Sequence, residues 1–428
     1  MDVERWTLDV LRFVMRVTVI NTGTELLLGQ VLNTHLRFIA QEIFRLGLRV
    51  AEQSTVPDGL PIRHAIERTF AKADIVFVTG GLGPTTDDIT REIAAELLGL
   101  ELKRDSALVS KITERLRTRG FPMTERILRQ AEVPDGAIVL PNRNGTAPGL
   151  YLRTRSTAAG QTPHLFLLPG PPPELCPMFE ASVVPILRKI APGHSGVALR
   201  NFRLAGVGES VVEAAVGLQL LALPGIELGY CARTGEVDVR VLGPEQTLAE
   251  AEAIVRGAFP DSFYTAADES LEEVVVRLLA KRGATLATAE SCTGGRLADR
   301  ITNVPGASVA FMAGYVTYAN EAKVAGLDVD PELIRENGAV SSVVAQAMAE
   351  GARKLSGSTH ALATTGIAGP TGGSDQKPVG TVFIALASAD GETLVEKRRY
   401  LTDRETFKHL ATQTALEMLR RRLIADSP

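Results

Sequence analysis

The chain has 428 residues, 45% of them hydrophobic and 22% charged, so two or three domains with sizeable cores are expected. Its formal net charge of −4 argues against a general nucleic-acid binder. Cys176, Cys231 and Cys292 lie far apart without a CxxC pair, which excludes a disulfide framework and favours the cytosol. No apolar run approaches a transmembrane helix in length, and acidic residues among the first ten positions do not fit a signal peptide.

The first predicted domain, residues 1–175, alternates strands with helices. Apolar runs at 17–20 and 75–78 predict buried strands, a further strand is expected at 49–55, and the segments 35–46 and 61–71 predict helices between them. This alternation indicates a parallel sheet covered by helices on both faces. Ligands bind such sheets beyond the carboxyl ends of the strands, and the two richest loops follow Ile20 and Val78.

The loop after the third strand combines glycines with two acids. Gly80, Gly81 and Gly83 let backbone amides approach a phosphate, and the helix that follows presents its N-terminus. The loop lacks the GxxxxGK[ST] pattern, which disfavours that class of NTPase. Asp87 and Asp88 offer hard oxygen ligands for a divalent cation on a pyrophosphate, with plain helix capping as the alternative.

Two further loops, at 141–149 and 169–174, adjoin predicted strands, the second following the strand at 164–168. Ordinary connecting loops are the alternative for both. The polar stretch 154–162 predicts a surface hairpin tip.

Four motifs resemble the molybdopterin-binding-like domain of the CinA family: TELLLG at 24–29, GGLGPTTDD at 80–88, NGTAPG at 144–149 and LPGPPPEL at 168–175. That domain is associated with ADP-ribose pyrophosphatase activity that needs a divalent metal, cobalt or magnesium. The resemblance implies Glu25 and Asp88 as acidic cleft positions, with Asp87 beside them. It implies the three loop glycines together with Asn142 and Thr146 as substrate-binding residues. A molybdopterin-binding or -transferring domain is the alternative, because one fold serves several chemistries.

Residues 176–265 predict a small α+β domain. Strands are expected at 201–204, 226–231 and 237–242, and helices at 209–221 and 248–258. The corresponding segment of the CinA family is likened to a KH module, which clamps RNA through a GXXG loop. Residues 206–209 do not supply that loop and the segment is not basic. We therefore expect a spacer or dimer-forming element without a nucleic-acid partner.

The third predicted domain, 266–428, is again α/β. A helix runs from Ser270 to Gly283, and strands are expected at 284–289, 311–318, 361–365 and 380–388. Between the first of these strands and a helix from Gly295 lies the sequence SCTGG, which begins at Ser291. Such a strand–turn–helix corner projects a side chain beside free helix N–H groups, as at a nucleophile with an oxyanion site. Simple capping by Ser291 or Thr293 is the alternative.

A serine nucleophile needs a base. His360 and His409 are the histidines of this domain, and neither lies in a motif-like loop. Lys323 is the better candidate, since Ser–Lys pairs are a variant of the triad and burial can depress a lysine pKa. A solvated surface lysine is the alternative. Cys292 either competes with Ser291 as nucleophile or is simply buried.

Five motifs resemble the PncC-type nicotinamide-nucleotide amidase, the C-terminal domain of the CinA family: AESCTGG at 289–295, YANEAK at 318–323, GAVS at 338–341, TGIAGPTGG at 365–373 and KPVGTV at 377–382. The resemblance implies Ser291 as the nucleophile. It carries over Ser308, Tyr318, Thr365 and Arg404 as active-site positions, and Thr293, Gly294, Gly295 and Gly366 as substrate-binding ones.

The resulting expectation is a cytosolic, homodimeric hydrolase of NAD salvage. Its fold would be two three-layer α/β domains with mainly parallel sheets, joined by a small KH-like α+β domain. Ser291 would deamidate nicotinamide mononucleotide without a cofactor, with Lys323 moving the proton, amides near 293–295 holding the oxyanion and Arg404 gripping the phosphate. The first domain would cleave ADP-ribose. The alternative is a non-enzymatic competence or DNA-repair adaptor, against which the acidic balance and the dense motifs argue.

Overall fold

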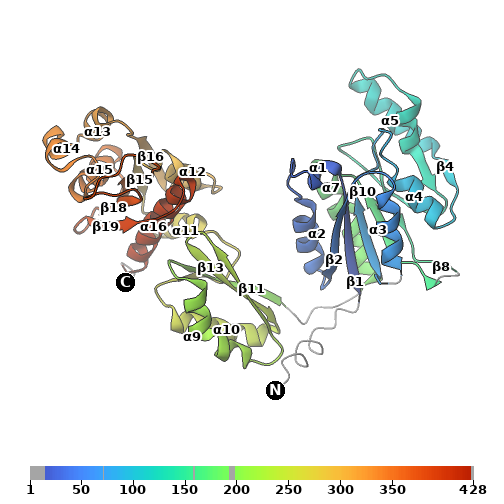
Figure 1. Cartoon of the computed structure of the whole chain (residues 1–428), viewed down its shortest axis with the longest axis horizontal. Helices are drawn as coiled ribbons and strands as arrows, with labels where there is room; N and C mark the ends of the chain where they lie inside the picture. The colour runs from blue at the N-terminus through green and yellow to red at the C-terminus, as the bar shows by residue number, and fades with distance from the viewer. Residues whose placement is uncertain (1–14, 71, 158–159, 192–197, 426–428) are drawn as a thin grey trace. The chain divides into compact units, whose positions relative to one another are not determined.

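The computed structural model describes residues 15–70, 72–157, 160–191 and 198–425 (Figure 1). The chain divides into two compact units, Met1–Val197 and Ala198–Pro428. No described helix is both long and apolar enough to cross a membrane. The acidic residues near the N-terminus, which do not fit a signal peptide, lie outside the described residues.

The first unit is built on a six-stranded sheet in the order β2-β1-β3-β10-β7-β6. Four strands are parallel neighbours, as predicted: β1 (Arg16–Thr22), β2 (Arg49–Val56), β3 (Ile75–Thr79) and β10 (His164–Leu168). β7 (Gly149–Leu152) and β6 (Ile138–Leu140) extend the sheet in antiparallel fashion. The inner strand β3 is buried throughout, which explains why it is a continuous apolar run.

Helices cover both faces of this sheet. On one face lie α2 (His35–Phe44), α7 (Pro172–Met178), the π-helical turn η3 (Phe179–Val183) and α8 (Val184–Ile190). On the other lie α3 (Pro61–Phe70) and α4 (Thr90–Leu97). The predicted domain boundary between 175 and 176 needs correction because it cuts α7. Met178 and Phe179 pack in the core of the first unit together with Leu175, and this unit extends to Val197.

A small excursion interrupts the sheet between α4 and β6 and projects at the upper right of Figure 1. It contains β4 (Leu102–Arg104), α5 (Ser106–Thr118), α6 (Glu125–Leu128), the 3-10 turn η2 (Arg129–Ala131) and β5 (Glu132–Pro134). Leu108, Ile112, Leu116 and Ala131 form its own core. The hairpin predicted at 154–162 is present as the paired strands β8 (Ser156–Thr157) and β9 (Gly160–Gln161).

The second unit begins with a four-stranded antiparallel sheet, in the order β12-β13-β11-β14. Its strands are β11 (Ala198–Ala205), β12 (Glu227–Arg233), β13 (Glu236–Gly243) and β14 (Phe263–Thr265), and its helices are α9 (Glu209–Leu221) and α10 (Glu245–Ala258). Phe202 and Val239 pack against Val216 of α9 and Val255 of α10. The short strand β14 was not predicted, because three residues are too few for a recognisable pattern.

The C-terminal sheet has the order β16-β15-β17-β18-β19. β15 (Leu286–Glu290), β16 (Phe311–Val316) and β17 (His360–Gly366) are parallel, whereas β18 (Thr381–Ser388) and β19 (Leu394–Arg399) add an antiparallel half. The predicted α/β fold class is confirmed.

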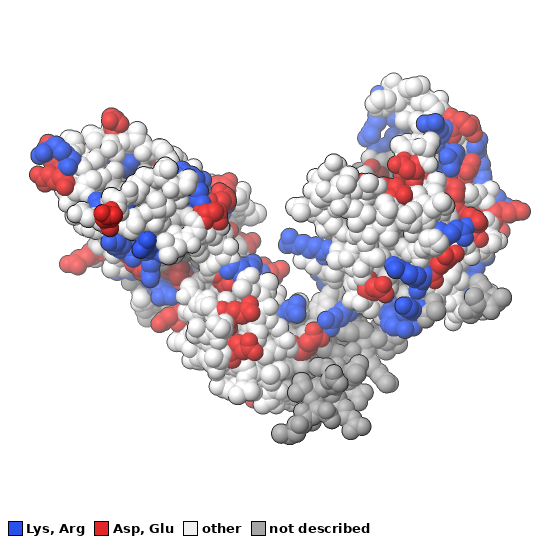
Figure 2. Space-filling view, in the orientation of Figure 1, with Lys and Arg blue, Asp and Glu red and all other residues white. Residues whose placement is uncertain are grey.

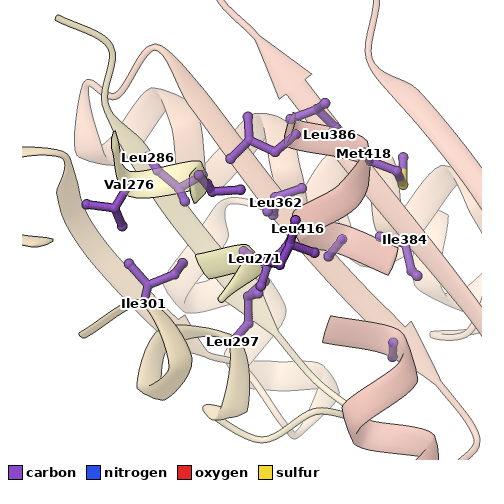
Figure 3. Close-up of a cluster of buried hydrophobic side chains, with 14 of the residues drawn as sticks. Leu271, Val276, Leu286, Leu297, Ile301, Leu362, Ile384, Leu386, Leu416 and Met418 are labelled. Atoms are coloured by element: carbon purple, nitrogen blue, oxygen red, sulfur yellow. The ribbon is translucent and has the colours of Figure 1, made fainter. Parts of the chain in front are cut away.

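Each face of the C-terminal sheet has its own apolar layer. Figure 3 shows the core that Leu286 and Leu362 of the sheet share with Leu271, Leu297 and Leu416. Those three belong to α11 (Leu271–Arg282), α12 (Arg296–Thr302) and α16 (Arg404–Ala425) respectively. The other face carries α13 (Asn320–Leu327), α14 (Pro331–Asn337) and α15 (Ser342–Ser356).

Polar contacts join α16 to the antiparallel sheet of the same unit. Gln413 Nε2 donates to Glu236 Oε1 at 2.6 Å, and the Tyr264 hydroxyl donates to the same oxygen at 2.9 Å. The guanidinium of Arg420, almost fully buried, donates to the backbone carbonyls of Asp261 and Phe263. Helix α16 therefore packs against the C-terminal sheet and is also hydrogen-bonded to the antiparallel sheet of the same unit.

Candidate functional site

A hollow of about 390 Å³ lies at the carboxyl ends of β1, β3 and β10, and we call it the glycine-loop pocket. It collects the predicted residues Glu25, Gly80, Gly81, Gly83, Asp87, Asp88 and Thr146, together with Asp58, Gln130 and Glu174. The loops come together here because parallel strands deliver their carboxyl ends to one edge of the sheet.

The loop over this pocket requires glycine at two positions. Gly80 and Gly81 have φ angles of 99° and 66°, in the left-handed region that side chains disfavour. A Cβ at Gly80 would lie 2.4 Å from Thr22 Oγ1, and one at Gly81 would lie 2.0 Å from Thr90 Oγ1. Both hydroxyls are buried without a hydrogen-bond partner among the described residues. The loop backbone therefore packs directly on polar groups.

Asp88 fastens this loop. Its Oδ2 accepts the Thr85 N–H at 2.9 Å and the Thr85 hydroxyl, and a Cβ at Gly83 would lie 2.5 Å from that oxygen. Hydrogen bonding to the Thr85 hydroxyl holds the pKa of Asp87 below its usual value, so this carboxylate is charged at neutral pH. One oxygen of Asp88 thus has a structural task, while Asp87 lines the pocket as an anion.

The acidic residues do not form a complete metal site by themselves. Within the described ranges, no group of three or more His, Cys, Asp or Glu side chains is close enough to hold a metal ion. Glu25, Asp87 and Asp88 nevertheless line one pocket and offer the hard oxygens that Mg²⁺ prefers. Mg²⁺ is commonly held by one or two carboxylates plus substrate phosphates, so the residues fit a cation that shares its coordination with a pyrophosphate.

Asn142 has a structural place beside this pocket. Its Nδ2 donates to Glu174 Oε2 at 2.6 Å and to the Ala147 carbonyl at 2.8 Å, and its Oδ1 accepts the Gly145 N–H at 2.7 Å. All of these bonds shape the loop that carries Thr146. Asn142 therefore positions the wall of the glycine-loop pocket.

Sequence reasoning missed Gln130. This residue of η2 is 1% exposed and lines the glycine-loop pocket, and its Oε1 is buried without a partner among the described residues. A buried amide with an unused hydrogen-bonding atom costs free energy unless a water or ligand satisfies it. No motif surrounds Gln130, and only the folding of η2 back over the sheet brings it here.

The predicted corner in the second unit is present at the carboxyl end of β15. The Ser291 N–H donates to the Thr364 carbonyl of β17 at 2.9 Å, which fixes the turn against the neighbouring strand. Ser291 is partly exposed, and its hydroxyl has no partner in the part of the chain that the structure describes. Gly294 and Gly295 follow with φ angles of 61° and 93°, which turn the chain into α12.

The expected set of oxyanion donors is smaller than predicted. Glu290, fully buried, accepts the N–H groups of Gly295 at 3.1 Å, Leu297 at 2.9 Å and Ala298 at 2.8 Å, and so caps α12. The Gly294 N–H donates to the Ser291 carbonyl at 3.2 Å. Of the amides expected at 293–295, that of Thr293 alone donates to no atom of the described residues.

Lys323 is buried, with 1% of its surface exposed, so the alternative of a solvated lysine is wrong. Its Nζ donates to the carbonyls of Thr317, Tyr318 and Ala319 at 2.9, 3.2 and 3.4 Å. Burial lowers its pKa, against smaller opposing effects of Cys292 and Glu321. The lysine lies near the Ser291 corner, but Nζ makes no hydrogen bond to the serine hydroxyl.

Cys292 fits the structural alternative. The side chain is 5% exposed, and burial raises the pKa of its thiol to about 12, despite a hydrogen bond from Thr364 that lowers it. The thiolate, which is the nucleophilic form, is therefore scarce at neutral pH. Thr364 also pairs with the buried Thr293 hydroxyl at 2.7 Å, so this side of the corner is packed.

Tyr318 and Arg404 meet at the surface of this site. The Nη2 of Arg404 donates to the Tyr318 hydroxyl at 2.8 Å, and its Nη1 donates to the Gly369 carbonyl at 3.1 Å. One turn along α16, Lys408 Nζ lies 3.9 Å from where a Cβ on Gly294 would stand. The spacing of Arg404 and Lys408 puts both cations on one side of the helix. Sequence reasoning missed Lys408, although that spacing was a usable signal.

Thr365 and Gly366 end β17 beside this group. The Thr365 hydroxyl is buried and donates to the Ala339 carbonyl at 2.8 Å, so it holds the loop before α15. Gly366 pairs with Val382 of β18, and a Cβ there would lie 2.7 Å from the Thr381 carbonyl. Both residues shape the site through the backbone.

Within one chain, Ser308 lies away from the other predicted residues of this site. It lies exposed in the turn η4 (Ala307–Val309), just before β16 begins at Phe311. Because β15 and β16 are parallel, this is the amino end of the strands, whereas Ser291 follows their carboxyl end. A strand of this length separates the two ends by roughly 16 Å. The expectation of one shared site therefore needs correction for Ser308.

Two family models match the chain. The CinA C-terminal domain matches residues 268–423, and the "Probable molybdopterin binding domain" matches residues 18–189. A CinA-like protein of Akkermansia muciniphila is 47% identical over 402 residues, covering 94% of this chain and 96% of its own. A CinA-like protein of Acidobacterium capsulatum is 40% identical over 420 residues, covering 96% and 100%. A solved competence/damage inducible protein from Agrobacterium tumefaciens is 39% identical, with a TM-score of 0.34, covering 36% of this chain and 97% of its own.

Proposed function

Because the chain belongs to the CinA family, we propose that it is a hydrolase of nicotinamide nucleotides. Its C-terminal domain would convert nicotinamide mononucleotide and water to nicotinic acid mononucleotide and ammonia. The observation that carries the proposal is the Ser291 hydroxyl, which stands partly exposed and without a partner at a strand–turn–helix corner, next to the unused Thr293 N–H. That pairing of nucleophile and oxyanion donor suits acyl transfer.

The proposed reaction has two steps, acylation of Ser291 and hydrolysis of the resulting ester. Ser291 Oγ attacks the carboxamide carbon and gives up its proton, the C–N bond breaks, and the nitrogen leaves as ammonia. Water then adds to the Ser291 ester and releases the acid and the free hydroxyl. The Thr293 N–H donates to the oxygen that becomes negative in both steps. A single backbone donor is enough to matter, since removing one such donor elsewhere costs about 10²–10³ in kcat.

Lys323 takes and returns the proton in this proposal. Its lowered pKa makes the neutral amine accessible, and no described histidine lies in the motif loops. A neutral amine has two N–H groups, so it gives up one of its three carbonyl acceptors and frees a lone pair. The Ala319 carbonyl, the most distant of the three acceptors, is the one whose loss would cost least.

Arg404 and Lys408 bind the nucleotide phosphate. Arg404 is exposed and already oriented by Tyr318 and Gly369, so its planar guanidinium is ready to form a forked pair with a phosphate. Lys408 adds a second positive charge close to Gly294. The phosphate would anchor the nucleotide so that its carboxamide lies over Ser291.

In the first domain the proposed reaction is hydrolysis of the ADP-ribose pyrophosphate, with water cleaving one P–O bond to leave AMP and ribose 5-phosphate. The Gly80–Gly83 backbone would approach the phosphates, and Asp87, Asp88 and Glu25 would hold a divalent cation beside them. The cation, cobalt or magnesium, would neutralise charge on the pyrophosphate. A homodimer and a cytosolic location also remain predictions.

The purified full chain, assayed on nicotinamide mononucleotide and ADP-ribose with and without Mg²⁺ or Co²⁺, tests both activities. Ammonia release without metal and AMP release with metal are expected. Asp88→Asn should abolish AMP release while ammonia release continues, because it removes a charge from the pocket but keeps an oxygen for Thr85. AMP release at the wild-type rate would remove Asp88 from the metal set.

A second candidate for the first domain is molybdopterin binding, which the description of the matching family model favours. Calorimetric titration with molybdopterin and with ADP-ribose separates the two. Tighter binding of molybdopterin without AMP release would replace the pyrophosphatase proposal. The adaptor alternative would be supported instead if the wild-type protein turned over neither nucleotide.

A further inference from the structure

A second hollow, of about 310 Å³, adjoins the glycine-loop pocket, and we call it the basic pocket. It is lined by Leu108, Lys111, Ile112 and Arg115 of α5, by Val139 of β6, and by Pro141, Asn142, Arg143, Gly145, Thr146 and Pro148. Thr146 lines both pockets, and Asn142 bonds to Glu174 of the first. The two hollows therefore meet at one loop and can hold two parts of one ligand.

The charges of the two pockets are opposite. Five acidic residues line the glycine-loop pocket, namely Glu25, Asp58, Asp87, Asp88 and Glu174. The described residues that line the basic pocket include three cations and no acid. Basic side chains are visible on the projection that carries α5, mixed with acidic ones (Figure 2), but those acids do not line the pocket. The basic pocket is thus suited to an anionic group.

Arg115 is held in place at the wall of the basic pocket. Its Nη1 donates to the Arg143 carbonyl at 2.7 Å, which ties α5 to the loop that carries Thr146. Its Nε is buried and has no partner among the described residues. The guanidinium is thereby fixed, and its Nη2, which makes no hydrogen bond to the described residues, is the donor available to a phosphate oxygen. Lys111 and the Arg143 side chain are exposed and free to close on the same group.

Apart from the three cations, most of the lining is apolar, with Asn142 and Thr146 as polar members. Leu108, Ile112, Val139, Pro141 and Pro148 surround the cations and can pack against the flat face of a base or the carbon skeleton of a ribose. The volume is at the lower end of the range for small-ligand pockets, which suits one nucleoside. An uncharged nucleoside, however, would leave three cations without a partner.

We propose that the basic pocket binds a phosphate carried on the ribose of the nucleoside. The first domain would then prefer pyrophosphates such as 2′-phospho-ADP-ribose over ADP-ribose itself. The inference rests on the proposed function in one respect, the seating of the pyrophosphate at Gly80–Gly83. From there the nucleoside extends past Thr146, and its extra phosphate reaches Lys111, Arg115 and Arg143.

The test compares kcat/KM of the full chain for ADP-ribose, 2′-phospho-ADP-ribose and the 3′-phosphate isomer, with binding followed by calorimetry. We expect kcat/KM for one phosphorylated substrate to exceed that for ADP-ribose by about 10-fold or more, the size of one charged hydrogen bond. The double variant Lys111→Met/Arg143→Met should lose about 10- to 100-fold on that substrate and stay within about twofold on ADP-ribose. Both side chains are exposed, so folding should be unaffected.

Arg119→Met is the matched control, since Arg119 is an exposed cation just past α5 that does not line the basic pocket. It should leave the preference unchanged. Equal kcat/KM for ADP-ribose and both phosphorylated substrates would overturn the inference, as would equal losses on all three in the double variant. Absence of hydrolysis with tight, Lys111- and Arg143-dependent binding of a phosphorylated ligand would support the subsite and reject the pyrophosphatase. Absence of any binding would reject both.

Discussion

The Nζ of Lys323 lies 2.9 Å from the carbonyl oxygen of Thr317, and with two further carbonyls this fills its three N–H directions. Two physical effects compete at this nitrogen. Burial favours the neutral amine, whereas the hydrogen bonds to three carbonyl oxygens favour the ammonium. The role of Lys323 as base depends on burial prevailing in the working pH range, and this can be measured.

Lys323→Met and Ser291→Ala should each lower kcat for ammonia release by at least about 10³-fold, with the double variant little worse than either. The pair acts as one unit, since neither the nucleophile nor the base works alone. Steady-state kinetics on nicotinamide mononucleotide measures this, with thermal unfolding to confirm that Lys323→Met is folded. If Lys323→Met were folded and active, another group would have to be the base, and Tyr318 is the next candidate.

The lowered pKa of Lys323 also predicts how stability depends on pH. Between that pKa and the usual lysine value of 10.5, the unfolded chain carries a proton that the folded protein has lost. Unfolding then takes up a proton, so the free energy of unfolding rises with pH across this interval. Urea titrations of the wild type and Lys323→Met should diverge in favour of the wild type as pH rises, whereas kcat/KM should rise with pH through the lowered pKa and level off above it. Parallel stability curves would contradict a lowered pKa.

Cys292→Ser should keep ammonia release within about fivefold of wild type, because a thiol with a pKa of about 12 supplies little thiolate at neutral pH. Serine preserves a hydrogen bond to Thr364 at similar size. Iodoacetamide labelling of the native protein at Cys292 should be correspondingly slow, and exposed Cys231 serves as the internal control. Loss of activity in Cys292→Ser together with an active Ser291→Ala would assign the nucleophile to the thiol.

Arg404→Met should raise KM for nicotinamide mononucleotide by about 10- to 100-fold, since it removes a charged hydrogen bond to the phosphate. Turnover at saturation should change far less. Nicotinamide riboside, which lacks the phosphate, is the control substrate, and its slow hydrolysis should be insensitive to the change. Tyr318→Phe removes one hydrogen bond that orients Arg404 and should give a smaller increase in KM. A pure loss of kcat in Arg404→Met would indicate contact with the reacting amide instead.

Glu290→Gln should destabilise the second unit by about 1–3 kcal/mol. The two oxygens of Glu290 accept the N–H groups of Gly295, Leu297 and Ala298, and the change replaces one of these oxygens by an amide nitrogen, which can only donate. The same change should lower ammonia release, since the cap sets the course of the chain from Ser291 into α12. Chemical denaturation and kinetics check the two effects. Glu321→Gln, on the exposed start of α13, is a control expected to change stability by less than about 0.5 kcal/mol.

The central strands of both α/β domains could be predicted because they are buried along their whole length and rich in apolar residues, as in β3 and β15. The corner at Ser291 was predictable for the same reason, since a strand of this kind meets two glycines. The helix cap by Glu290 was not, because a carboxylate after a strand has no pattern that reveals which amides it will face. The excursion from β4 to β5 and its residue Gln130 were also missed, although α5 is an amphipathic helix of 13 residues, because its other elements are short and no motif marks the segment.

The Tyr318–Arg404 pair lies 86 residues apart in the chain and was reached only through the family resemblance. Spacing alone gives no information about such contacts. The same resemblance also supplied Ser308. Because β15 and β16 are parallel, Ser308 lies at the amino ends of these strands, whereas Ser291 lies at their carboxyl ends. A motif therefore identifies positions, while the direction of each strand decides which of them meet.

Helix α16 is one continuous helix of 22 residues, roughly 33 Å long, with Arg404 in its first turn and Arg420 near its end. Its far end is clasped by the Asp261 and Phe263 carbonyls next to β14. A protein shortened to begin at Asp268 would lose these two backbone acceptors and leave that buried guanidinium with Glu417 alone, whereas one that begins at Ala198 keeps them. The second unit therefore holds this helix at both ends: the antiparallel sheet binds the end that carries Arg420, and Tyr318 and Gly369 orient Arg404 at the other.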